Sequence, residues 1–243
     1  MASTKNLTES NKDYSVFLPS ISSFYSKFIR QAQKRPDFVK PERMPKGFEF
    51  GIDGFDFLKP KDNYYSYKWG LYSAGHATRD PAKSDEQEPM IQKRDREHSF
   101  ILGDSGGFQI ATGVIKCDWK NFKTDDDLRI TILNWLEHTA DYSMVLDVPT
   151  LAAAPPLNAK TGLKDWVDCL DYTIHNNDYF VKHRQGKTKF LNVLQGNNEQ
   201  QADDWFSAVK HYPFEGWAMA GYNMKQLHLA LRRLIVMRDE KLL

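Results

Sequence analysis

From about residue 66 onward, the chain alternates between short apolar runs and longer segments with helical periodicity. The apolar runs lie at 69–73, 99–102, 142–146, 190–194 and 216–219. Each has the length of a β-strand and ends in a small or polar residue, as strands of a buried sheet do. Strands that alternate with helices predict a parallel sheet.

The segments between the later runs space their apolar residues as amphipathic helices do, at 126–138, 163–184, 200–210 and 224–240. Two architectures share this pattern, a (β/α) barrel and an open doubly wound sheet. Both bind their ligands at the carboxyl ends of the strands. We therefore expect functional residues where each apolar run ends.

Composition is that of a soluble globular protein, with 243 residues, 41% of them hydrophobic and 27% charged. A net charge of +1 gives no global argument for a nucleic-acid partner, so any basic surface must be local. No apolar run approaches the ~18 residues of a membrane span, and the start does not resemble a signal peptide. Only two cysteines occur, which fits a reducing compartment, and we expect a cytoplasmic protein.

Two regions were distinguished along the chain. Residues 1–65 are expected to form an irregular basic extension, and 66–243 the strand–helix domain. The basic residues within 17–50 are either a solvated face or contacts to phosphate groups. The mixed charges of 79–98 predict an exposed loop.

The hexapeptide Asp-Ser-Gly-Gly-Phe-Gln, which begins at Asp104, directly follows one of the apolar runs. A carboxylate at the end of a buried strand can transfer a proton, and Gly106 and Gly107 allow a flat ligand to approach the backbone closely. Phe108 offers a face for stacking, and Gln109 offers a donor and an acceptor. The alternative is a strand-to-loop turn in which Asp104 caps the next segment.

Further strand ends carry small or polar residues. Asp147 could accept two neighbouring donors, such as those of the Watson–Crick edge of guanine, or it could cap its own loop. The amide of Gln195, followed by Gly196, could pair with a base edge. Gly221 would leave backbone N–H groups free for a carbonyl oxygen. His76 could carry a proton, contact a phosphate or be structural.

In order and approximate spacing, these elements resemble the base-pocket segments of the tRNA-guanine transglycosylase family. They lie at 104–109, 146–147, 194–196 and 220–221, and the similarity covers roughly residues 66–240. The family folds as a (β/α)8 TIM barrel and exchanges guanine for a 7-deazaguanine through a covalent enzyme–nucleic acid intermediate. The resemblance thus implies an α/β barrel and a glycosyltransferase that needs no cofactor.

Transferred residue by residue, the resemblance makes Asp104 the catalytic acid/base. Asp147 would bind N1–H and the exocyclic amine of the base, Phe108 would stack on it, and Tyr222 would replace a leucine usual in the family. The predicted substrate-binding residues are Ser105, Phe108, Gln109, Asp147, Gln195, Gly196, Gly221 and Tyr222, with His76 as a further candidate.

Two family features have no counterpart in the sequence. The family's nucleophilic aspartate lies on a later strand, whereas the chain stops at Leu243, so we count five of eight barrel strands. The family's zinc site, three cysteines and a histidine, is also missing, and no other metal-ligand spacing occurs. We therefore expect a truncated product or one part of a split enzyme, in which a second polypeptide supplies the remaining strands and the nucleophile.

The segments 17–20 and 71–76 look more like relatives that place 7-deazaguanines in DNA, which occur in phages and in bacterial modification clusters. DNA is therefore the expected nucleic acid and tRNA the alternative, and a DNA guanine would have to be flipped out or single-stranded. Two other interpretations remain: a non-catalytic subunit that binds the base and nucleic acid, and an unrelated barrel enzyme that acts on a small molecule.

Overall fold

The computed structural model describes residues 15–34, 41–76, 88–124 and 126–243. Its centre is a sheet of five parallel strands, β1 (Trp69–Ser73), β2 (Phe100–Asp104), β3 (Tyr142–Met144), β4 (Lys189–Leu194) and β5 (Gly216–Met219). The strands lie side by side in the order β1-β2-β3-β4-β5. The predicted α/β fold with a parallel sheet is confirmed.

This strand order separates the two architectures that the sequence left open. A doubly wound sheet changes direction at an internal strand. In the described sheet every strand lies beside its predecessor, with no such reversal, so the doubly wound arrangement does not apply. Sequential parallel strands are the arrangement that a (β/α) barrel requires.

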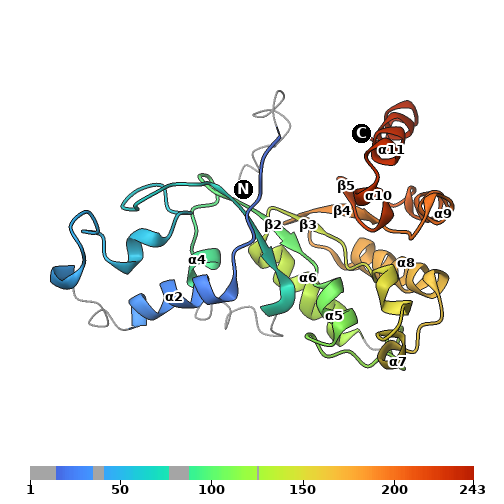
Figure 1. The fold of residues 1–243 in the computed structure, drawn as a ribbon, viewed down its shortest axis with the longest axis horizontal. Helices are drawn as coiled ribbons and strands as arrows, with labels where there is room; N and C mark the ends of the chain where they lie inside the picture. Colours follow the sequence, from blue (N-terminus) through green and yellow to red (C-terminus); the bar gives the residue numbers. More distant parts are fainter. Residues whose placement is uncertain (1–14, 35–40, 77–87, 125) are drawn as a thin grey trace.

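Helices follow the strands at their carboxyl ends (Figure 1). They are α5 (Gly107–Thr112) after β2; η4 (Thr150–Ala153), α7 (Asn158–Thr161) and α8 (Trp166–His183) after β3; α9 (Glu199–Val209) after β4; and α10 (Tyr222–Lys225) and α11 (Leu227–Asp239) after β5. α6 (Asp127–Thr139) precedes β3. Two of these helices begin at a side-chain cap. The Asp165 side chain accepts from the backbone N–H groups of Val167 and Asp168 at the start of α8, and the Asn198 side chain accepts from that of Gln201 at the start of α9.

Two apolar clusters form the core. One joins the N-terminal part to β1, β2 and α6, and includes Ile101 and Trp135. The other joins β4, α8, α9 and α11, and includes Leu194, Trp205 and Met237. The indole N–H of Trp205 also donates to the carbonyl of Val193 at 3.0 Å, which fixes α9 on β4.

The N-terminal part is more regular than the sequence indicated. It contains α2 (Ser23–Lys34), η1 (Pro41–Arg43) and η2 (Ile52–Phe55), and α2 contacts both η2 and α4 (Pro89–Gln92). Just before α2, Leu71 N–H donates to Pro19 O (2.8 Å) and Ile21 N–H donates to Leu71 O (2.9 Å). The outer edge of β1 is therefore covered.

The segment predicted as an exposed charged loop is only partly described, since residues 77–87 lie outside the described part. Its described remainder is only partly exposed: Lys93 and residues 95–97 are exposed, whereas other residues are buried. Glu88 and Arg94 are buried, as are Met90 and Ile91 of α4. The Arg94 guanidinium binds the Asp141 carboxylate at 2.7 Å, so this charged residue belongs to an ion pair with the rest of the domain and not to an exposed loop.

Candidate functional site

A pocket of about 500 Å³ opens at the carboxyl ends of β2 to β5. This volume is within the range of small-molecule sites. The structure brings seven of the predicted site residues together in its lining, namely Asp104, Phe108, Asp147, Gln195, Gly196, Gly221 and Tyr222. They come from four different strand ends, which explains why residues more than 100 positions apart meet here.

Three predicted residues are not among those that line the pocket. Ser105 is buried. Gln109 lies on α5 with its side chain beside Gly75 and Gly106, and its Oε1 is buried without a hydrogen-bond partner among the described residues. The backbone of His76 forms part of η3 (Ala74–His76), but its side chain lies outside the described part of the structure.

Asp147 is the most constrained group of the pocket. Its side chain is buried, and its Oδ2 accepts a hydrogen bond of 2.7 Å from Nε2 of Gln195. Burial raises the pKa of the Asp147 carboxyl to about 6; the nearby Asp104 carboxylate adds to this shift, and the hydrogen bond from Gln195 opposes it. A buried carboxylate of this kind is stabilised by further hydrogen-bond donors, which a ligand in the pocket can supply.

The backbone on both sides of Asp147 is held by α8. The amide of Asn176 donates to Leu146 O, and the hydroxyl of Thr173 accepts from Val148 N, both at 2.9 Å. Asn176 and Thr173 are fully buried. The position of the Asp147 side chain is therefore fixed by a rigid helix behind the pocket rather than by a free loop.

Glycines allow the strand ends to come this close. A Cβ on Gly107 would overlap the carbonyl oxygen of Asp147, so only glycine lets the turn after β2 pack on the end of β3. Gly221 has a φ of 57°, and a Cβ there would lie 2.7 Å from Gly196 O and 2.9 Å from Oε1 of Gln195. Both contacts are too short for an alanine.

The backbone near Gly221 also supplies a hydrogen-bond donor. The N–H groups of Ala220 and Tyr222 donate toward β4, to Leu194 O and Gly196 O, each at 2.9 Å. The N–H of Gly221, between them, has no acceptor among the described residues. This donor is located beside the amide of Gln195, at the lining of the pocket.

Asp104 and Phe108 also line the pocket. Asp104 is the last residue of β2, and one of its carboxylate oxygens accepts from Gly106 N at 3.3 Å. Phe108 follows on the first turn of α5, with 58% of its surface exposed although it lines the pocket. An aromatic ring left open at a pocket mouth is available for a flat ligand to stack on.

Several lining residues are not among the site residues predicted from the sequence. They are Met144, Pro149, Thr150, Leu151, Val193, Asn197, Ala218, Met219, Ala220, Met224 and Lys225. The hydroxyl of Thr150 donates to Oδ1 of Asn197 at 2.8 Å and thereby links the loops after β3 and β4. The only sequence feature that points to these lining residues is that each is within a few residues of a predicted strand end.

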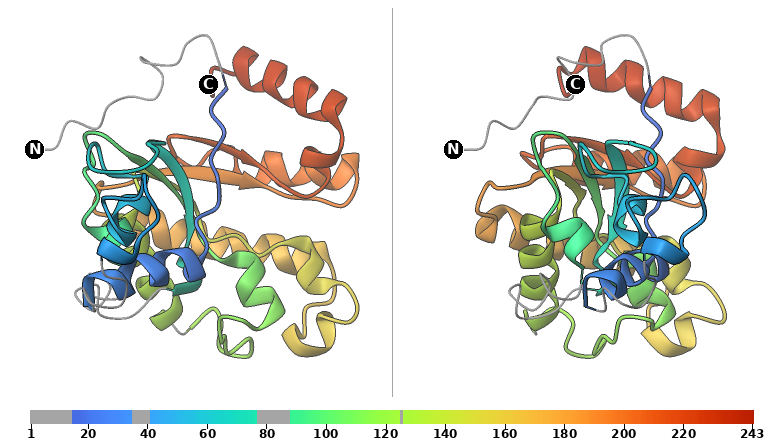
Figure 2. Two further views of the ribbon diagram at one scale, coloured as in Figure 1. Left: turned by 60° about the vertical axis from the view of Figure 1, so that its left-hand side comes forward. Right: turned by 90° about the vertical axis from the view of Figure 1, so that its left-hand side faces the viewer.

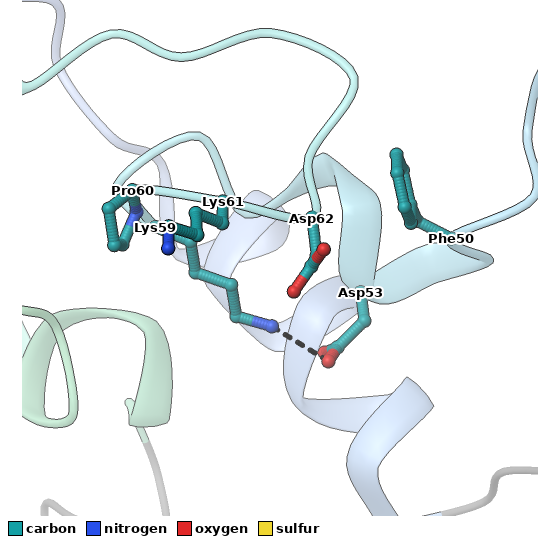
Figure 3. Close-up of a pocket in the computed structure, with 6 residues that line it drawn as sticks. All are labelled: Phe50, Asp53, Lys59, Pro60, Lys61 and Asp62. Carbon is teal, nitrogen blue, oxygen red and sulfur yellow. Dashed lines mark hydrogen bonds and ion pairs between the residues drawn. The ribbon is translucent and has the colours of Figure 1, made fainter.

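A second hollow, of about 390 Å³, lies in the N-terminal part. Figure 3 shows its lining, which consists of Phe50, Asp53, Lys59, Pro60, Lys61 and Asp62. Its most prominent charges neutralise each other, because Nζ of Lys59 binds Oδ2 of Asp53 at 2.7 Å. The pocket at the strand ends, where acceptors, a donor and an aromatic face converge, is the better candidate.

Comparison of the chain with models of known protein families and with curated proteins gave no match. Within the described ranges, no group of three or more histidine, cysteine or acidic residues is arranged to hold a metal ion. No helix of the described residues is both long and apolar enough to cross a membrane. The function must therefore be inferred from the geometry of the pocket.

Proposed function

We propose that the protein is a base-exchange transglycosylase that replaces guanine in DNA with a 7-deazaguanine derivative. The observation that carries this proposal is the buried Asp147 carboxylate, held by Gln195 and facing the same pocket as Phe108 and the Gly221 N–H. Guanine presents two adjacent donors, N1–H and the exocyclic amine, beside the carbonyl oxygen O6. That pattern is complementary to a carboxylate next to a backbone N–H.

In this assignment the base lies flat against the Phe108 ring, with its Watson–Crick edge toward Asp147. O6 accepts a hydrogen bond from Gly221 N–H, and Gln195 and Gly196 bind the edge opposite the one that Asp147 binds. Bases that lack guanine's donors leave the Asp147 carboxylate unpaired in a buried position, which costs about 1–3 kcal/mol or more. The pocket therefore selects guanine and 7-deazaguanines, which share this edge.

Asp104 is the catalytic group in this proposal. The bond between the base and C1′ breaks through a sugar with oxocarbenium character. A carboxyl group beside the leaving base can donate a proton to it and accept one from the base that enters. The chain would form five strands of a (β/α)8 barrel, and a cytoplasmic location follows from its nucleic-acid substrate, in a host cell if the gene is that of a phage. tRNA is the alternative substrate.

A second candidate function is supported by one observation. Among the residues that line the pocket, only Asp104 and Asp147 carry carboxylates. If Asp147 reads the base and Asp104 moves the proton, no described carboxylate of the lining is left to attack C1′. The protein would then be a base-binding subunit whose partner supplies the nucleophile.

The test is incorporation of labelled guanine into guanine-containing DNA and, separately, into tRNA. We expect incorporation into DNA. The rate of incorporation should be at least a hundredfold lower in Asp104→Asn, because removal of a general acid/base costs ~10²–10⁴-fold in rate. Glu97→Gln, which alters an exposed carboxylate at the opposite end of β2, is the matched control and should retain the wild-type rate.

Guanine binding, measured by calorimetry on the same samples, separates the two candidate functions. Binding without incorporation supports the subunit and contradicts exchange by this chain. If neither guanine binding nor incorporation is detected, and calorimetry gives the same result for Asp147→Asn as for the wild type, the assignment of the pocket to guanine is contradicted.

A further inference from the structure

The two edges of the sheet differ. The outer edge of β1 is paired with residues 19–21, whereas no described residue pairs with the outer edge of β5. All four residues of β5 are only half-buried. Because Ala220 directs its N–H toward β4, the N–H of the preceding strand residue, Met219, points to the open edge. Met219 also lines the pocket. The open edge therefore leads directly into the pocket.

The helix that follows β5 has an apolar face without a partner among the described residues. Leu227, Leu231, Leu234 and Ile235 of α11 are 75%, 51%, 40% and 51% exposed. They recur at positions i, i+4, i+7 and i+8, the spacing of one helix face. A contiguous apolar face of this kind on a soluble protein indicates an interaction site.

The opposite face of α11 packs on the rest of the domain. The exposure of the apolar face is therefore not caused by a helix that lacks tertiary contacts. Oδ1 of Asp203 on α9 accepts from Arg232 at 2.7 Å and also binds Arg233. Met237 is fully buried in the second apolar cluster. Figure 2 shows α11 along one side of the molecule, apart from α6 and α8.

The repeat of the fold indicates what covers this surface. Each strand is followed by a helix, and consecutive helices pack side by side, α8 against α9 and α9 against α10 and α11. One further repeat would place a parallel strand beside β5 and its helix against the exposed face of α11. A second copy of this chain fits less well, since a two-fold axis would make the two β5 strands antiparallel.

We propose that the outer edge of β5, at Met219, and the apolar face of α11, at Leu227, Leu231, Leu234 and Ile235, bind a second polypeptide. The bound segment is a β-strand that adds parallel to β5, followed by an amphipathic helix that packs on α11. Its strand ends beside Gly221 and closes the open wall of the pocket. Only this last effect rests on the proposed function.

The experiment is site-specific photo-cross-linking of the full chain in the cells that naturally make it. p-Benzoylphenylalanine is placed at Leu231 in one variant and at Met219 in another. The control position is Ile130 on α6, which is 46% exposed and belongs to a different helix. We expect both test positions, but not Ile130, to label one strand–helix segment of another polypeptide.

Three results would overturn the proposal. They are cross-links between two copies of this chain, cross-links no stronger than those from Ile130, and cross-links to segments that do not form a strand followed by a helix. The identified polypeptide is then purified with the chain, and Leu231→Glu should weaken the complex at least tenfold, whereas Ile130→Glu should not. An unchanged affinity of Leu231→Glu also overturns the proposal.

Incorporation of labelled guanine by the reconstituted complex separates this proposal from the proposed function. A complex that forms as predicted but neither binds guanine nor exchanges it leaves the docking surface intact and contradicts the base-exchange assignment. If the chain exchanges guanine alone and no cross-linked polypeptide is found, the base-exchange assignment is supported and the docking surface is contradicted.

Discussion

At the scale of single residues, the protonation state of Asp147 decides what the pocket can bind. The ionised carboxylate accepts hydrogen bonds from N1–H and the amine of guanine, whereas the protonated form presents a donor to one of them. With its pKa raised to about 6 by burial, the group changes state close to neutral pH. We therefore expect guanine affinity to be nearly constant above about pH 7 and to fall about tenfold from pH 7 to pH 5.

The stability of the fold should respond with the opposite sign. A raised pKa means that the folded protein binds this proton more tightly than the unfolded chain does, so Asp147 lowers the free energy of unfolding as the pH rises from about 4 through 6. Asp56 is buried outside the pocket, and burial raises its pKa to about 6 as well. Stability alone therefore cannot separate the two carboxyl groups.

Calorimetry of guanine binding from pH 5 to pH 8 can separate them. Asp147→Asn should bind weakly at every pH, with no slope, while Asp56→Asn should keep the wild-type slope. If Asp147→Asn keeps the pH dependence of the wild type, another group is responsible and the role assigned to Asp147 is wrong.

At the scale of secondary-structure elements, α8 acts as the support of the pocket. Thr173 accepts the N–H of Val148 next to Asp147, inside the core. In Thr173→Val this buried N–H loses its acceptor, and we expect a loss of about 1–3 kcal/mol in stability. Guanine affinity should also fall, because the Asp147 backbone is no longer fixed.

Thr188→Val is the matched control for this variant. Thr188 is equally buried, but its hydroxyl donates to Leu136 O and Ala140 O, just before β4 begins and therefore at the other end of the sheet from the pocket. Denaturant unfolding and calorimetry should show that Thr188→Val loses stability and retains guanine affinity. Equal affinities for the two variants would contradict the supporting role of α8.

Some secondary-structure elements and site residues can be predicted from the sequence, and others cannot. Strands β1 and β5 match the predicted runs, because a short apolar run followed by a polar residue identifies a buried strand. Gln109 could not be placed from the sequence, since its direction depends on where the turn at Gly106 and Gly107 sends α5. Glu88 was assigned to an exposed loop because its burial depends on contacts distant in the sequence.

At the scale of the whole molecule, the depth of the pocket restricts the form of nucleic acid that can react. Asp147 is buried in a pocket formed by four strand ends, whereas Phe108, which also lines it, is largely exposed. A guanine stacked in a duplex cannot reach it, and extrusion costs a few kcal/mol, least for a mispaired or single-stranded base. With a net charge of only +1, general attraction between protein and DNA cannot offset that cost.

We therefore expect labelled guanine to enter a single-stranded or mispaired guanine position at least ~10 times faster than the same position paired with cytosine, since 1.4 kcal/mol corresponds to a factor of ten. The measurement uses the base-exchange-competent protein, with its partner if one is required, and oligonucleotides that differ only in the opposing base. Substrate concentrations above saturation remove differences in binding. Equal rates would mean that extrusion does not limit the reaction and that the base is read in a more open site than the pocket beside Asp147.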